Sequence, residues 1–250
     1  MNGQHLSELM DKKSIEEVWA LHCRYMRSFG FDRLLYGFTR FKTENSFGDR
    51  QDALILSNHD PAYLEIYFAD DRFRDAPMTR WAEHNAGACS WSVRERLAQN
   101  GELTENAKRV LQLNEEFGVN CGITISFKDL APGGFGAIGL TGATELSQDD
   151  VDRIWARHGD EILLCNNAMH LRALTLPSPN RNRLTDRQRE VLEWTANGKT
   201  VSEVGALIDR KPATVEKHLR LARAALNAET TAQAVLKASV QNQIFMDTLR

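Results

Sequence analysis

The chain has few cysteines and no apolar run that approaches the length of a membrane span. Its four cysteines are scattered, and none belongs to a Cys-x-x-Cys pair, so the sequence indicates neither a zinc site nor a disulfide framework. The N-terminal residues lack the features of a signal peptide. We therefore expect free thiols, no membrane partner and a cytoplasmic location.

The chain also lacks the patterns that would indicate an enzyme. Its seven histidines show no metal-ligand spacing, and there is neither a nucleophile elbow nor a phosphate-binding loop. Five of them fall at positions expected to be helical: His22, His84, His158, His170 and His218. The sequence therefore predicts a protein without catalytic residues, metal or cofactor, apart from a small-molecule ligand discussed below.

Charge is divided unevenly along the chain. Residues 176–250 carry 12 Lys and Arg against 8 Asp and Glu, a net +4, whereas residues 1–175 carry 19 against 26, a net −7. A basic segment behind an acidic one is typical of a protein in which only one part meets phosphate. Pro177 and Pro179 interrupt the helical pattern between the two parts. The predicted organisation is a domain at 1–174, a linker at 175–183 and a domain at 184–250.

The second domain is predicted to contain four short helices. Thr185 is placed to cap the first, and Gly198 follows that helix where a left-handed residue is favoured. Thr200 and Glu203 form a capping-box pattern for the second helix. Pro212 suits the first turn of the third, and an apolar pattern after it predicts the fourth.

The third of these helices carries a polar, mostly cationic face opposite its apolar positions. Two short helices followed by such a helix form the helix-turn-helix arrangement, in which the later helix enters the major groove of DNA. Glu216 and Arg220 lie one turn apart and can read cytosine and guanine. The residues expected to bind phosphates are Lys199, Thr200, Thr214, Lys217 and Arg223. The alternative interpretation is a helical bundle with surface charge only.

The first domain mixes helical and strand patterns. Helices are predicted at 14–29, 62–68, 77–84, 104–117 and 147–174, and strands at 34–41, 53–57, 122–127 and 135–142. Helices before and after an antiparallel sheet predict an α-β-α sandwich, which has room for a pocket between the sheet and one helical layer. The predicted fold class is therefore α+β, with an all-α four-helix domain at the C-terminus.

Aromatic residues are concentrated between Tyr63 and Trp91, a segment that also contains Tyr67 and Trp81. Aromatic side chains with polar tips, placed beside a sheet, are typical of an apolar pocket that orients a ligand by a few hydrogen bonds. The alternative interpretation is that these are ordinary core residues.

Residues in both domains carry a family resemblance. In the second domain, the runs Leu184-Thr185-x-Arg187-x-x-Glu190-Val191-Leu192, Gly198-Lys199-Thr200 and Gln233-Ala234-Val235 resemble the LuxR-type helix-turn-helix. In the first domain, a second set is similar to the acyl-homoserine lactone-binding domain of LuxR-type quorum-sensing regulators: Tyr63-x-x-x-Tyr67, Pro77, Trp91 and Phe117-Gly118-Val119-x-x-Gly122. Together the two resemblances cover nearly the whole chain.

The resemblance implies that an N-acyl homoserine lactone binds between the sheet and the helices. It implies that Tyr63 donates to the lactone carbonyl, that Tyr67 bonds the amide carbonyl, and that Trp91 packs on the lactone ring. A carboxylate immediately before the proline would accept the amide N–H. By strand register, Thr141 is placed at the acyl amide and Thr124 on the opposite strand.

The sequence departs from the family at two of these positions. Tyr63 stands where Trp is usual, so a donor remains, but on a differently aimed group. Ala76 precedes Pro77, and the nearby carboxylate of Asp75 is one residue early. Either a local backbone shift returns Asp75 to the pocket, or the ligand amide loses its charged acceptor, at a cost of about 1 to 3 kcal/mol.

The resemblance predicts a quorum-sensing-type regulator of transcription that binds a palindromic promoter site as a homodimer under the control of an N-acyl homoserine lactone. Paired half-sites multiply the specificity of a small module, and the predicted helix at 147–174 offers apolar positions for a dimer contact. RNA polymerase is a further candidate partner. The alternative is a solo regulator that responds to a different ligand or to none. A response regulator is disfavoured, because the first domain begins with helices and builds antiparallel strands.

Overall fold

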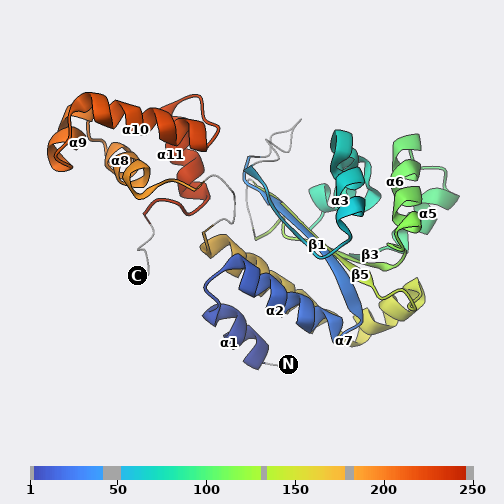
Figure 1. Ribbon diagram of the computed structural model, residues 1–250. Helices are drawn as coiled ribbons and strands as arrows, with labels where there is room; N and C mark the ends of the chain where they lie inside the picture. The colour runs from blue at the N-terminus through green and yellow to red at the C-terminus, as the bar shows by residue number, and fades with distance from the viewer. Residues whose placement is uncertain (1–2, 42–51, 131–133, 178–182, 246–250) are drawn as a thin grey trace. The chain divides into compact units, whose positions relative to one another are not determined.

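The computed structural model describes residues 3–41, 52–130, 134–177 and 183–245. The chain divides into two compact units, Met1–Leu174 and Thr175–Arg250 (Figure 1). Part of the predicted linker, residues 178–182, lies outside the described residues. Within the described ranges, every helix is too short or too polar to span a lipid bilayer.

The first unit is built on an antiparallel sheet with the strand order β2-β1-β5-β4-β3. The strands are β1 (Phe31–Thr39), β2 (Leu54–Ser57), β3 (Gly87–Ser90), β4 (Gly122–Ser126) and β5 (Phe135–Gly142). The edge strand β3 is absent from the sequence-based prediction, and it pairs with β4 so that Cys89 lies beside Thr124. The central strand β5 pairs with β4 on one side and β1 on the other, which sets Gly139 between Thr124 and Leu35.

Helices cover both faces of this sheet (Figure 1). One layer contains α1 (Gly3–Asp11), α2 (Ile15–Arg27) and the long α7 (Gln148–Thr175). The other contains α3 (Pro61–Phe68), the 3-10 helix η2 (Ala69–Asp75), α4 (Pro77–His84), α5 (Val93–Gln99) and α6 (Glu105–Glu116). The α-β-α sandwich predicted from the sequence is confirmed. Of these helices, α1, η2 and α5 were not predicted.

The two faces of the sheet differ in side-chain size. Alternate residues of a strand point to opposite faces, so each strand contributes one set to each layer. The side chains that face α2 and α7 are large, and each of these residues is at most 1% exposed: Leu34, Tyr36, Ile123, Ile125, Ile138 and Leu140. The set facing α3 and α4 includes the large Leu35 and Phe135, but most of its members are small: Gly37, Thr39, Thr124, Ser126, Ala137, Gly139 and Thr141. One face is therefore packed solid, and the other leaves space.

Two histidines lie fully buried in the solid layer. His170 on α7 shares a 2.9 Å hydrogen bond with the Tyr36 hydroxyl and stacks on Phe127 at a ring-centroid distance of 4.2 Å. His22 on α2 shares a 3.0 Å hydrogen bond with Asn166. Burial lowers the pKa of both imidazoles to about 4, so both are neutral in the folded protein near neutral pH.

The second unit consists of α8 (Asp186–Ala196), α9 (Val201–Leu207), α10 (Pro212–Ala225) and α11 (Thr231–Val240). Thr185 and Thr200 each complete a capping box, and Pro212 opens α10. A Cβ on Gly205 would lie 2.6 Å from the carbonyl oxygen of Arg210, so the turn between α9 and α10 requires glycine there. The four predicted helices are confirmed.

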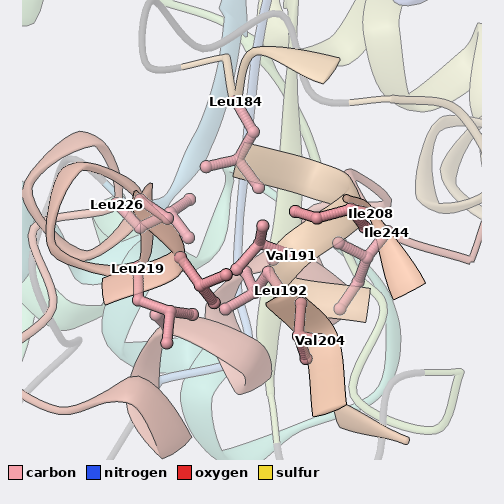
Figure 2. Packing of buried hydrophobic residues seen from close by; sticks show 12 residues of the cluster. Leu184, Val191, Leu192, Val204, Ile208, Leu219, Leu226 and Ile244 are labelled. Atoms are coloured by element: carbon pink, nitrogen blue, oxygen red, sulfur yellow. The ribbon is translucent and has the colours of Figure 1, made fainter. Parts of the chain in front are cut away.

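A single apolar cluster holds these four helices together (Figure 2). Its side chains come from every helix and from the segments that flank them: Leu184, Val191, Leu192, Val204, Ile208, Val215, Leu219, Ala222, Leu226, Ala234, Ala238 and Ile244. Most of the helical members recur at three- or four-residue spacing, as Val215, Leu219 and Ala222 do on α10, which is why the sequence predicts the buried faces. The core fixes which faces of α9 and α10 remain outside.

Candidate functional site

A cavity of about 340 Å³ lies between the small-residue face of the sheet and the layer containing α3, η2 and α4. Gly37 and Gly139 line it from neighbouring strands, together with Ala137. A Cβ built on Gly37 would meet no atom within 4 Å, so the space next to this strand is open. The cavity volume is in the range of small-molecule sites in proteins.

One wall of the cavity is a row of rings that begins just before α3 and continues along it. His59, Tyr63 and Tyr67 are four residues apart, a spacing that places side chains on the same side of a helix. The rings of His59 and Tyr63 stack with centroids 5.1 Å apart, and those of Tyr63 and Tyr67 with centroids 5.3 Å apart. Further rings line the cavity beyond them, namely Phe68, Phe73 and Phe135.

The two tyrosine hydroxyls are held by polar neighbours. The Tyr63 hydroxyl donates to Oδ1 of Asn114 on α6 at 2.9 Å, and the side chain of Thr79 on α4 hydrogen-bonds to Tyr67. Burial raises the pKa of both phenols, so each stays protonated across the physiological range. Both hydroxyls are therefore neutral, and the Tyr63 hydroxyl, whose hydrogen goes to Asn114, has lone pairs left to accept from a ligand.

Trp91, the residue after β3, also lines the cavity. It is 6% exposed, and its indole N–H donates to the Thr124 hydroxyl on β4 at 2.8 Å. A Cβ on Gly122 would lie 2.9 Å from the indole ring, so glycine at this position of β4 makes room for the tryptophan. The guanidinium carbon of Arg94 lies 4.5 Å from the ring centroid, a cation–π distance.

The structure places Ala76, and not Asp75, at the cavity. Ala76 is 6% exposed and belongs to the lining. Asp75 is not part of the lining, and its carboxylate accepts a 2.7 Å bond from Nη2 of Arg80. Among the described lining residues the only carboxylate is Asp71, which pairs with Arg74 at 3.0 Å. The backbone shift that would have returned Asp75 to the pocket is not present.

Five of the six ligand-binding residues predicted from the sequence line this cavity: Tyr63, Tyr67, Trp91, Thr124 and Thr141. Polar lining residues that the sequence reasoning missed are His59, Thr79, Arg94 and Asn114. The interval of four residues between His59 and Tyr63 could have indicated that His59 lines the cavity. Arg94 and Asn114 sit on helices whose approach to α3 no local pattern predicts.

In the second unit, α10 presents polar residues to solvent while its apolar face is buried. Val215 and Leu219 are buried, whereas Glu216, Lys217 and Arg220 beside them are exposed. None of these three makes an ion pair with a described residue, so all three are available to a partner.

The remaining residues predicted to contact phosphate differ in exposure. Lys199 and Thr200 are exposed before α9, where the Thr200 hydroxyl donates to the Glu203 carboxylate at 2.8 Å. Thr214 and Arg223 are half-buried on α10, and Nη1 of Arg223 donates to the Thr231 hydroxyl at 3.3 Å. Thr200 thus caps the N-terminus of α9, in addition to any contact that it makes with a phosphate.

Comparison with protein families gives a match for each of the two units. Residues 14–173 match the autoinducer binding domain, and residues 182–238 match the bacterial regulatory proteins of the luxR family. The chain belongs to the LuxR family. As a member of this family with an autoinducer-binding domain, it is a quorum-sensing-type regulator of transcription and not an enzyme, as the sequence predicted.

Curated LuxR-family relatives resemble the chain over most of its length. The quorum sensing-dependent transcriptional regulator RpaR of Rhodopseudomonas palustris is 37% identical over 190 residues, which are 74% of this chain and 73% of that protein. The transcriptional activator protein SolR of Ralstonia nicotianae is 28% identical over 219 residues, 85% of this chain and 86% of that protein.

Solved structures of the LuxR family share the fold. SdiA in complex with octanoyl-rac-glycerol aligns over 95% of this chain and 93% of that chain, with a TM-score of 0.50 and 17% identity. CepR2 from Burkholderia cenocepacia, an N-acylhomoserine lactone-dependent LuxR-family transcription factor, aligns over 68% and 92%, with a TM-score of 0.50 and 18% identity. At these identities the likeness concerns the fold.

Proposed function

We propose that this LuxR-family regulator binds promoter DNA as a homodimer under the control of an acyl ligand in the cavity, with an N-acyl homoserine lactone as the leading candidate. The observation that carries the proposal is the cavity itself. It combines apolar rings with a small number of hydrogen-bonding groups, the composition expected of a site for a chain with a polar head.

A second candidate is a ligand that has no amide N–H and therefore needs no charged acceptor in the cavity. Ala76 favours it, because this methyl group lines the cavity where the family resemblance implies a carboxylate. In this case the chain would be a solo regulator that responds to a different acyl compound. The two candidates differ in the ligand only, and the DNA-binding output is the same.

The proposed output rests on α10. Glu216 and Arg220 are exposed and lie one turn apart. In the major groove, Glu216 can accept a hydrogen bond from cytosine, and Arg220 can donate two hydrogen bonds to guanine. Lys217 on the same face is suited to a phosphate contact. We further propose a palindromic site, because two copies related by two-fold symmetry present this helix to two half-sites. RNA polymerase remains a candidate partner.

A dimer contact is proposed on the first unit. Leu164 and Leu171 of α7 are 40% and 46% exposed, and their spacing of seven residues places them on one side of the helix. Large apolar side chains arranged in this way on a surface helix are suited to packing against a second copy. The measured mass of the full-length chain in solution, with and without DNA, tests this contact.

The ligand is tested by binding N-acyl homoserine lactones of several acyl lengths to the wild type and to Ala76→Asp. If the ligand is a lactone, Ala76→Asp restores an acceptor for its amide N–H and raises the affinity by about tenfold to a hundredfold. Asp75→Asn is the matched control, because it removes an exposed ion pair outside the cavity and should leave the affinity unchanged.

The two candidates give different results in this experiment. Binding of a lactone to the wild type, with a gain in Ala76→Asp, supports the leading candidate. If no lactone of any length binds to the wild type or changes its thermal stability and DNA affinity, the lactone is not the ligand, and the second candidate stands.

A further inference from the structure

Arg94 gives the cavity a charge that the described lining does not balance. The pair of Asp71 and Arg74 is neutral in sum, and it accounts for the only carboxylate among the described lining residues. Arg94 also lines the cavity but makes no ion pair with a described residue. The described wall of the cavity therefore carries one uncompensated positive charge.

The guanidinium of Arg94 is held in a fixed position. Its carbon lies 4.5 Å from the centroid of the Trp91 ring, which gives the planar group a surface to lie against. Its Nε donates to the carbonyl oxygen of Trp91 at 3.3 Å, and its Nη2 donates to the carbonyl oxygen of Asn120. No hydrogen bond within the described residues uses Nη1, so its two hydrogens are available to a ligand.

The surroundings of Arg94 make this charge unfavourable without a partner. Burial lowers the pKa of the guanidinium to about 10, which still leaves it protonated at neutral pH. A cation that has lost part of its water gains most from an anion, because a charge-assisted hydrogen bond is stronger than one between neutral groups. The unused hydrogens on Nη1 of Arg94 are thus suited to bind an anionic oxygen.

The neutral groups near Arg94 are also able to donate to an acceptor. Nδ2 of Asn114 has two hydrogens besides the Oδ1 that accepts from Tyr63. The Thr124 hydroxyl accepts the indole N–H of Trp91 and retains its own hydrogen. With Ala76 in place of a carboxylate, the described lining contains several hydrogen-bond donors and has Asp71, paired with Arg74, as its only carboxylate.

We propose that Arg94 binds the head group of the ligand, and that the cavity prefers an acyl compound whose head ends in a carboxylate. This inference rests on the proposed function, since it assumes that the cavity is the ligand site. A carboxylate offers two anionic oxygens to the planar guanidinium, whereas a lactone offers neutral oxygens only. The proposal thus develops the second candidate, a ligand other than the lactone, and the class of ligand is an acyl compound with a free carboxylate; the ring-opened N-acyl homoserine serves as the probe because it differs from the lactone in the head alone.

The wild-type full-length chain provides a test without any substitution. Calorimetric titration at slightly acidic pH compares an N-acyl homoserine lactone with the ring-opened N-acyl homoserine of the same acyl length. The carboxylate should bind about tenfold tighter or more, and added salt should weaken it more than it weakens the lactone. Equal or tighter binding of the lactone would overturn the proposal.

Substitutions at Arg94 identify the group responsible. Arg94→Gln should lower affinity for the ring-opened compound by about tenfold or more and leave that for the lactone nearly unchanged, while Arg94→Lys should recover part of the loss. Arg96→Gln is the matched control, because Arg96 is exposed on the same helix and does not line the cavity. Equal losses for both compounds would show that Arg94 only supports the packing of Trp91.

Failure of this inference is distinguishable from failure of the proposed function. Binding of the lactone alone overturns the role of Arg94 and leaves the cavity as the ligand site. Absence of binding for both compounds at every acyl length, with unchanged thermal stability and DNA affinity, overturns the carboxylate proposal together with the acyl-ligand site.

Discussion

The two units of this chain use different means to form a site. In the second unit α8, α9 and α11 begin at threonine caps and α10 begins at Pro212, all local signals, and the exposed face of α10 follows from the period of the helix. In the first unit the cavity is formed by strands and helices that lie far apart in the sequence. A surface site can thus follow from local rules, whereas a cavity depends on long-range packing.

The use of threonine illustrates this difference. Thr200 stabilises its own helix through hydrogen bonds to Glu203, three residues away. Thr124 accepts the indole N–H of Trp91, which lies thirty-three positions earlier in the chain. A change at the first residue should therefore have a local effect, and a change at the second should alter the cavity.

The largest expected effect is the loss of stability of the first unit in acid. Burial lowers the pKa of His22, His59 and His170 from 6.5 to about 4. As the pH falls, each histidine takes up its proton in the unfolded chain before it does so in the folded one. The contribution of each neutral histidine to the free energy of unfolding is therefore complete above about pH 6.5 and is lost as the pH falls to about 4. It amounts to up to about 3 kcal/mol for each residue.

Thermal unfolding of the full-length chain between pH 7 and pH 4 measures this effect. His22→Gln keeps a hydrogen-bonding group beside Asn166 and cannot be protonated, so its stability should depend less steeply on pH than that of the wild type. A melting temperature of the first unit that does not change over this range would contradict the expectation.

The next effect concerns the two faces of the sheet. Gly37→Leu places a side chain in the open space of the cavity and should lower ligand affinity by about a hundredfold, because overlap with a bound ligand costs about 3 kcal/mol. Ligand titration and thermal unfolding of the same variant separate binding from stability, which should be unchanged.

Gly136→Ala is the control for this substitution on the other face. Gly136 pairs with Phe38 across the strands, and its added Cβ would lie 3.0 Å from the Phe38 ring. This variant should lose stability by about 1 to 3 kcal/mol and keep the ligand affinity of its folded fraction. Loss of affinity in both variants, or in neither, would refute the distinction between the faces.

A third prediction concerns the exposed face of α10. Arg220→Ala should remove about 1 to 3 kcal/mol of discrimination between promoter sites, because this residue is proposed to read a base. Lys217→Ala should weaken binding to all DNA about equally and reduce the salt dependence by about one counterion. Footprints and binding isotherms at several salt concentrations that do not distinguish the two variants would place the reading face elsewhere.

The smallest expected effect is the loss of a local cap. Thr200→Ala removes the capping box of α9 and should destabilise the second unit by about 1 kcal/mol, while Thr200→Ser should restore most of the loss. Chemical denaturation followed by the fluorescence of Trp194, the tryptophan of this unit, measures the change. An equal loss in the serine variant would show that the hydroxyl is not the stabilising group.

The sequence predicted the elements that short-range interactions define. The capping pattern of Thr200 with Glu203, Pro212 at the start of α10, and the alternation along β4 each depend on residues a few positions apart. The edge strand β3 was not predicted, because it has only four residues and these are small and partly polar. They form a strand only by pairing with β4.

The choice between Asp75 and Ala76 also lay beyond the sequence. A shift of one residue in the backbone exchanges the two side chains, and no pattern around them fixes the register. In the structure the ion pair between Asp75 and Arg80 lies outside the cavity, and Ala76 precedes α4 with its methyl group buried in the lining. In our proposals, the head-group chemistry of the ligand depends on this one position and on Arg94.

By itself the sequence determined the family, the four-helix unit with its exposed Arg220 and Glu216, and the sandwich around a sheet, because caps, prolines and periodic apolar residues act over one or two turns of chain. Only the tertiary structure decided that Ala76 lines the cavity and that Arg94 lies on Trp91 with no anionic partner among the described residues. These side chains are brought together by packing between distant elements, and the energy of such packing belongs to the whole unit rather than to any segment of it.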